Sequence, residues 1–127
     1  MNSQIRLLLD GRIVEIRVKG RVTRTAFEQF GPTLRNLMER HGSIRLLLLY
    51  DQFDGWTIGG YRRAFGFHFR HRRKIERLAI VGLSPNLRRF ARMSLSPARE
   101  LRFFESAESD EANAWIWEGL DDASQPD

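Results

Sequence analysis

Residues 44–50 read IRLLLLY, and residues 75–82 read IERLAIVG. Each is a near-continuous apolar run of strand length, which is typical of a strand that is covered on both faces. A loop and a helical pattern follow each run, so strands and helices alternate from here onwards. This alternation predicts crossover connections, parallel strands and covering helices, and hence an α/β protein.

The N-terminal part predicts a hairpin and an interrupted helix. Asp10-Gly11 suits the positive φ angles of a two-residue hairpin turn. The turn separates two predicted strands, residues 4–9 and 12–19. A helix follows, capped by Thr23 or Thr25. We expect it to be kinked or broken at Gly31-Pro32, because proline cannot donate the helical hydrogen bond.

The remaining elements complete one layered fold. A fifth short strand is predicted at residues 100–105, and later helices are predicted at 58–73, 86–95 and 108–120. We therefore expect an α/β fold with a single mixed, mainly parallel five-stranded sheet, an N-terminal β-hairpin and helices on both faces, in the order ββαβαβαβα. Ligands of such sheets bind where loops leave the carboxyl ends of the strands.

Length and composition place the chain among single-domain proteins. Its 127 residues suffice for one core, and we expect a domain at residues 1–120 followed by a flexible acidic tail at 121–127. There is no cysteine, which excludes disulfides and thiolate chemistry. No apolar run has the length of a signal peptide core or a membrane span, so a cytoplasmic protein is expected.

The net charge of +5 is unevenly distributed along the sequence. Residues 55–99 contain eleven Lys or Arg and one acid, whereas residues 100–127 contain nine acids and one arginine. The basic middle could attract an anionic membrane, an acidic protein or nucleic acid. It could equally form solvated helix faces that pair with the acidic end.

Several strings, taken in order, resemble a known family. They are GRV at residues 20–22, a Pro-interrupted helix ending in HGSIRLLL, then FDGWT, HRRKIERLAIVG and RFFE. Their order and spacing resemble the bacterial SpoIIAA-like family of the STAS-like superfamily. The resemblance implies a fold like that of the anti-sigma factor antagonists, related also to lipid-binding CRAL-TRIO domains. It implies ligand binding, membrane association or regulatory protein contact, and brings no catalytic residues.

One departure from the family concerns phosphorylation. Anti-sigma factor antagonists that are phosphorylated carry an Asp-Ser pair at the start of the helix after the third strand. This chain has Trp56-Thr57 there. The alternative function, a regulatory protein-interaction module of the anti-sigma factor antagonist type, would therefore lack the phosphorylatable serine.

The segment from 53 to 73 predicts a ligand site beneath a mobile helix. On a helical wheel Ile58, Tyr61, Phe65 and Phe69 form one stripe, which we expect to be the buried face, and Phe67 lies roughly opposite. Glycines at the helix start lower its stability, which suits a lid. A small or lipid-like apolar ligand would contact residues at the carboxyl edge of the sheet and on this lid: Asp51, Phe53, Trp56, Thr57, Tyr61 and Phe65. The simpler alternative for Trp56 is packing on the sheet.

The same helix and the next one predict a basic surface for an anionic membrane face or an acidic partner, which would make the protein peripheral at the inner membrane. Phe67 would insert among the lipids, unless it packs against the next helix or is simply an exposed residue. The surface comprises Arg63, Phe67, Arg70, Arg88, Arg89 and Arg92.

Enzymatic and nucleic-acid functions are disfavoured. His68 and His71 are one helical turn apart, but arginines surround them and further metal ligands are lacking, so we expect a solvated basic flank and no metal. Asp51 and Asp54 have no partnering His or Lys, and no phosphate-binding loop is present, so neither a catalytic site nor a cofactor is predicted. Nucleic-acid recognition motifs are lacking. The sequence does not decide whether the protein forms a homodimer.

Overall fold

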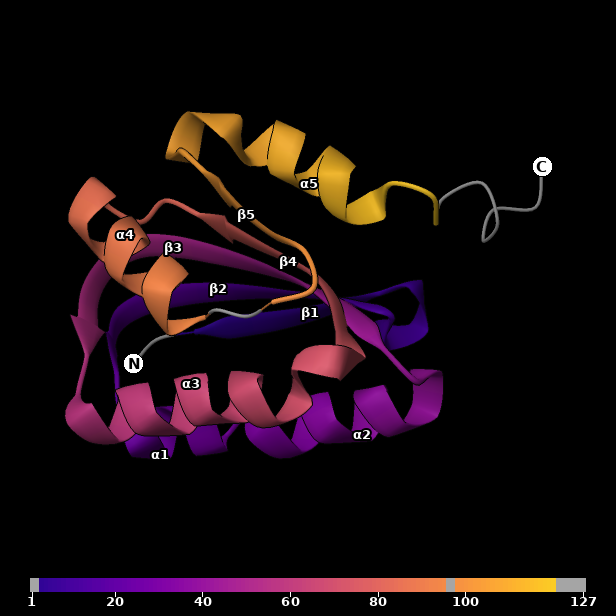
Figure 1. The fold of residues 1–127 in the computed structure, drawn as a ribbon, viewed down its shortest axis with the longest axis horizontal. Coiled ribbons are helices and arrows are strands. Elements are labelled where there is room, and N and C mark those ends of the chain that lie inside the picture. Colours follow the sequence, from indigo (N-terminus) through magenta and orange to yellow (C-terminus); the bar gives the residue numbers. More distant parts are fainter. Residues whose placement is uncertain (1–2, 96–97, 121–127) are drawn as a thin grey trace.

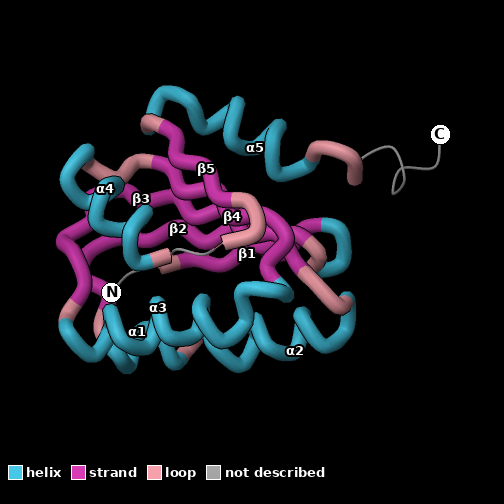
Figure 2. Tube along the Cα trace, in the orientation of Figure 1, coloured by secondary structure: helices cyan, strands magenta, loops and turns pink. Residues whose placement is uncertain are grey.

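In the computed structural model, which describes residues 3–95 and 98–120, five strands form one sheet in the order β1-β2-β3-β4-β5 (Figures 1 and 2). The β1–β2 pair is antiparallel and the other pairs are parallel. The strands are β1 (Gln4–Leu8), β2 (Ile13–Val22), β3 (Ile44–Trp56), β4 (Ile75–Val81) and β5 (Leu101–Phe104). The helices are α1 (Arg24–Glu28), α2 (Gly31–His41), α3 (Ile58–His71), α4 (Pro85–Ser94) and α5 (Ser109–Trp117). The predicted mixed α/β sheet is confirmed; the predicted tail at 121–127 lies outside the described residues.

The apolar runs of β3 and β4 are buried on both faces because their side chains alternate between two cores. Leu46 and Leu48 pair with Leu78 and Ile80 on β4 and face the core shared with α2, α3 and α4. Leu47 lies on the other face, in the core covered by α5. Helices α1 to α4 therefore cover one face of the sheet, and α5 covers the other (Figure 1).

Two elements differ clearly from the sequence expectation. A three-residue 3₁₀ turn, Leu9–Gly11, replaces the expected two-residue hairpin turn. The sequence predicted that the third strand ends at residue 50, but β3 continues to Trp56 alongside β2. Positive φ angles at Gln52 and Gly55 and two register shifts let this segment bend while it stays paired.

The helix predicted to break at Gly31-Pro32 is indeed two helices. α1 ends at Glu28 and α2 begins at Gly31, with Pro32 in its first turn, where a missing amide hydrogen is tolerated. Thr23 caps α1 by accepting a hydrogen bond from the Ala26 amide at 3.1 Å. The break lets α1 pack beside α3, while α2 covers the sheet.

The N-terminal end of α3 is fixed to the end of β2. The Thr57 hydroxyl caps α3 by accepting a hydrogen bond from the Gly60 amide at 3.0 Å, and it donates to the Val22 carbonyl at 3.4 Å. The Val22 carbonyl also accepts the Thr57 amide at 3.0 Å and lies against the α-carbon of Gly60. A side chain at residue 60 would collide with this carbonyl, so glycine is required here.

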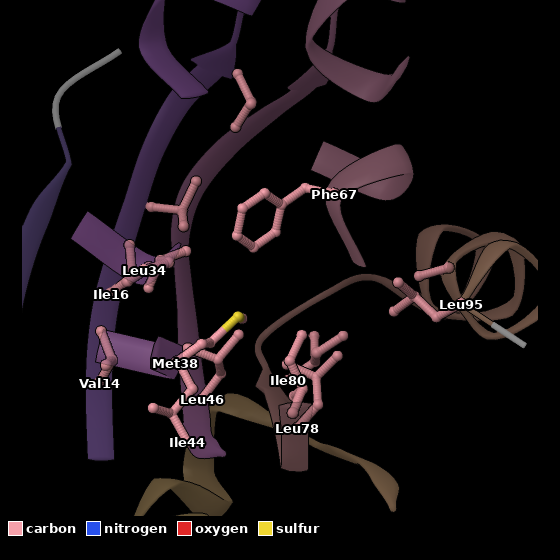
Figure 3. Packing of buried hydrophobic residues seen from close by; sticks show 14 of the residues in the cluster. Val14, Ile16, Leu34, Met38, Ile44, Leu46, Phe67, Leu78, Ile80 and Leu95 are labelled. Atoms are coloured by element: carbon pink, nitrogen blue, oxygen red, sulfur yellow. The ribbon is translucent and has the colours of Figure 1, made fainter. Parts of the chain in front are cut away.

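This contact decides which face of α3 is buried, and the wheel-based prediction was wrong about it. Phe67, expected to be off the buried stripe and to insert into a membrane, is 4% exposed. It projects from α3 into the core (Figure 3) and packs edge-to-face on Phe27 of α1 with ring centroids 5.4 Å apart. Ile58 and Phe69, expected to be buried, are 75% and 56% exposed. The inner face is the small-residue side, Gly60 and Ala64.

Two arginines beneath α5 link the basic strands to the acidic C-terminal part. Arg45, 6% exposed, pairs with Glu76 at 3.0 Å and donates to the carbonyls of Ile116 and Glu118 at 3.0 and 2.7 Å. Arg77 donates to the Trp115 carbonyl at 2.8 Å and pairs with the Glu118 carboxylate at 3.1 Å. These cations satisfy carbonyls at the C-terminus of α5, where the helix dipole also favours positive charge.

Two of the three glycines of α3, Gly60 and Gly66, should respond oppositely to substitution by alanine. Gly60→Ala should destabilise the protein by about 2 kcal/mol or more, because its methyl group would force α3 away from Val22. Gly66→Ala meets open space and should stabilise the protein by about 0.5–1 kcal/mol through helix propensity. Urea denaturation of both variants measures the difference. Equal effects would mean that α3 is not held by this contact.

Candidate functional site

An apolar cavity of about 100 Å³ lies between the sheet and the helices that cover it. The strands contribute branched side chains such as Ile16, Leu48 and Ile80. Its helical wall comes from Ala64 and Phe67 of α3 together with residues of α1, α2 and α4. Protein interiors seldom leave voids larger than a water molecule, so a cavity of this size is a feature that calls for a function.

A second lobe of about 80 Å³ adjoins the first. The two lobes share Tyr50, Trp56 and Ala64 among their lining residues, and the second adds Val18, Val22 and Phe30. Because Ala64 borders both lobes, a larger side chain at this one position would occupy the space between them. The lobes follow the inner face of α3 toward its fixed base.

A wall of aromatic rings borders the cavity at the carboxyl end of β3. Trp56 meets Phe53 at 4.8 Å and Phe65 at 5.2 Å between ring centroids, both edge-to-face. Tyr61 lies 4.6 Å from Phe65 and 5.4 Å from Phe90 of α4. The edge-to-face contacts of Trp56 have a geometry that aromatic pairs prefer, so they stabilise the wall. The Tyr61 hydroxyl and the Ser94 hydroxyl, 3.2 Å apart, also join α3 to α4.

His68 brings polar nitrogen atoms to this apolar lining. Its side chain lines the first lobe, and the residue is 7% exposed. Within residues 3–95 and 98–120, neither ring nitrogen has a hydrogen-bond partner. Burial lowers the pKa of His68; the nearby Leu95 backbone acts in the opposite direction, and the charge of Arg72 lowers the pKa further. His68 is therefore neutral at pH 7, and its unsatisfied nitrogens cost about 1–3 kcal/mol each.

The predicted ligand-binding residues have separate positions. Trp56 and Phe65 line the cavity. Phe53 and Tyr61 pack behind them in the aromatic wall. Thr57 caps α3. Asp51 is exposed and pairs with Lys19 at 3.7 Å, away from the lining.

The predicted basic surface is also divided. Arg63 and Arg70 border an open groove of about 710 Å³ along the outer side of α3, whose other cations are Arg24 and Arg62. The exposed side chains of Ile58 and Phe69 line the same groove. On α4, Arg89 and Arg92 are exposed and Arg88 is half-buried, and Arg92 lies over the Phe103 ring at 4.8 Å. Phe67 belongs to the interior, as described above.

Sequence reasoning missed most of the residues that line the cavity, among them Phe27, Tyr50 and His68. The sequence placed Tyr50 only in a strand and His68 on a solvated flank. The spacing of Gly60, Ala64, Phe67 and His68 fits one helical face, and this pattern could have placed His68 on the inner side of α3.

Searches for other sites in the described parts of the chain give two negative findings. No group of three or more His, Asp or Glu residues there could hold a metal ion. None of the helices at residues 3–95 and 98–120 has the length and apolar character needed to cross a membrane.

The buried His68 should make stability depend on pH. Below the unfolded-state pKa of about 6.5 the unfolded chain binds a proton that the folded protein does not, so stability should fall with decreasing pH until the lowered folded pKa is reached. The additional slope is at most about 1.4 kcal/mol per pH unit. His68→Phe should lack it. Urea denaturation between pH 7.5 and 5.5 measures this, and parallel curves for the two proteins would contradict the assignment.

Comparison with known proteins gives the family of this chain. The model of the SpoIIAA-like family matches residues 13–117. A search of curated protein sequences finds no match.

Solved structures share the fold at low sequence identity. An uncharacterized protein of the DUF3478 family with a SpoIIAA-like fold, from Shewanella loihica PV-4, is 21% identical, with 91% of this chain and 92% of that chain covered and a TM-score of 0.69. The anti-sigma factor antagonist SpoIIAA in its unphosphorylated form is 16% identical, with 92% of this chain and 99% of that chain covered and a TM-score of 0.67. The Bacillus cell fate determinant SpoIIAA in its phosphorylated form is 19% identical, with 87% of this chain and 97% of that chain covered and a TM-score of 0.56. Since the family model spans most of its length, this chain belongs to the SpoIIAA-like family.

Proposed function

We propose that this protein is a non-enzymatic binding protein that takes up a small apolar molecule in the cavity beneath α3. The observation that carries the proposal is the two-lobed cavity, whose lining is apolar except for a few groups such as His68. Empty apolar volume destabilises a fold by roughly 24 cal/mol per Å³, so the first lobe alone represents about 2 kcal/mol. A ligand that fills it recovers much of this energy.

The cavity volume limits the size of the ligand. An engineered apolar cavity of about 150 Å³ holds benzene. Lobes of about 100 and 80 Å³ therefore suit one ring with a small substituent, or a short alkyl chain. A lipid of ordinary length would require α3 to move outward.

A ligand would enter the cavity beside the C-terminal half of α3. Its base is fixed by the Thr57 cap and the Gly60 contact, so a hinge there, as the glycines suggested, is disfavoured. Gly66 has open surroundings and lowers helix stability by about 1 kcal/mol relative to alanine. The C-terminal half of α3 therefore serves as the mobile cover.

A side chain that fills the cavity tests the proposal. Ala64→Leu should weaken the binding of toluene by about tenfold or more, because the added carbons occupy the volume shared by the lobes. Ala114→Leu, at an exposed position on α5, should bind like the wild type. Titration followed by ¹H–¹⁵N NMR spectra measures affinity and confirms folding. Ala64→Val serves the same purpose if leucine unfolds the protein.

Two outcomes would overturn the proposal. One is a folded wild-type protein that binds no toluene up to its aqueous solubility. The other is an Ala64→Leu variant, shown to be folded, that binds toluene as tightly as the wild type. Native mass spectrometry of protein purified without detergent would show in addition whether an apolar compound copurifies.

A second candidate function, association with an anionic membrane surface, is favoured by the outer side of α3. The exposed apolar side chains of Ile58 and Phe69 lie in a groove with Arg62, Arg63 and Arg70. Basic residues attract anionic headgroups, and apolar side chains contribute by insertion. This arrangement replaces the one expected from Phe67.

Substitutions on α3 separate the two contributions to vesicle binding. Ile58→Ser with Phe69→Ser should weaken binding to phosphatidylserine vesicles at every salt concentration, by about 1–3 kcal/mol per side chain. Changing Arg62, Arg63 and Arg70 to glutamine should weaken binding mainly at low salt, where Coulomb attraction is least screened. Cosedimentation measures both.

Leu7→Ser is the matched control for this experiment, because it removes an exposed apolar side chain from β1. It should bind vesicles as the wild type does. Failure of the wild type to cosediment at low salt would refute the membrane candidate.

The alternative is regulatory contact with a protein partner. The Thr57 hydroxyl is engaged at both the Gly60 amide and the Val22 carbonyl, so its phosphorylation would disrupt the start of α3. Control by phosphate at this residue is therefore disfavoured. Stoichiometric phosphate on Thr57 in protein from growing cells would favour the partner-regulating function instead.

A further inference from the structure

His68 specifies the chemical class of the ligand, an inference that rests on the proposed function. It is the residue in the cavity lining whose buried ring nitrogens both lack a hydrogen-bond partner among the described residues. A water molecule held there would need two to four polar partners, which an apolar lining does not offer. A ligand with one polar group can supply the missing hydrogen bond.

The surroundings of His68 indicate which kind of polar group. A neutral imidazole has one N–H donor and one bare nitrogen acceptor. A hydroxyl group can donate to the bare nitrogen or accept from the N–H, so it fits either tautomer of the ring. A carboxylate can only accept, and burying its charge in this apolar lining would be costly.

We propose that the ligand is a phenol-like or short-chain hydroxyl compound, whose apolar body fills the lobes and whose hydroxyl donates a hydrogen bond to His68. This goes beyond an apolar cavity, because it predicts discrimination between molecules of nearly equal shape. Phenol and toluene differ only in the hydroxyl and methyl substituents on the ring. Benzoate is the corresponding anionic probe.

The test compares affinities for phenol and toluene in the wild type and in His68→Phe. The preference for phenol, expressed as the ratio of the two dissociation constants, should be about tenfold larger in the wild type, which corresponds to one hydrogen bond of ordinary strength. The variant should still bind toluene, which shows that the cavity persists. His68→Gln keeps a donor and an acceptor and should restore part of the preference.

A second readout comes from the ring itself. In protein with ¹⁵N-labelled histidine, phenol should shift the signal of the bare His68 ring nitrogen, and toluene should leave it nearly unchanged. This measurement uses the wild-type protein and does not depend on the folding of any variant.

The outcomes separate this inference from the proposed function. If neither toluene nor phenol binds the wild type, the cavity is not a ligand site and both fail. If toluene binds and the phenol preference is the same in His68→Phe, the hydroxyl ligand is refuted while the apolar cavity stands. Tighter binding of benzoate than of phenol would overturn the hydroxyl class in favour of an anion.

Discussion

The close contact between Gly60 and the Val22 carbonyl fixes the rest of the site. It places the start of α3 against the end of β2, where the Thr57 cap and backbone hydrogen bonds hold it. Once the helix is fixed at this point, its 3.6-residue period turns Ala64, Phe67 and His68 toward the sheet. Phe67 reaches into the core, whereas Ala64, about one turn earlier, is too small to fill the space beside it. The cavity lies in the space next to Ala64.

The two faces of the sheet divide the work of the basic residues. Beneath α5, Arg45 and Arg77 donate hydrogen bonds to backbone carbonyls of the acidic C-terminal part, and Arg77 also pairs with a carboxylate there. Their positive charges therefore stabilise the fold. The arginines along the outer side of α3 keep most of their charge exposed, with Arg63 paired to Glu28 at 3.5 Å. The basic residues thus have two roles: Arg45 and Arg77 stabilise the packing of α5 on one face of the sheet, and the arginines of α3 line a groove on the other side of the molecule.

Much of the fold could be predicted because strong local patterns agree with the tertiary structure. The apolar runs of β3 and β4, the interruption at Gly31-Pro32 and the cap at Thr23 each predict the element that is found. The family resemblance is confirmed as well. The site was harder to predict. α3 carries apolar residues on two faces, and the choice between them depends on the Gly60 contact, which joins residues far apart in the sequence. His68 looked solvated for the same reason.

The most direct test of a ligand cavity beneath α3 is a crystal structure of the wild-type protein under xenon pressure. Xenon is apolar, and it enters dry cavities of suitable size without needing any particular functional group. The account predicts xenon density in the space bordered by Ala64, Phe67 and Ile80, and no density at that place in Ala64→Leu crystals. Side chains that fill this space in the wild-type crystal, or ordered water in place of xenon, would contradict it.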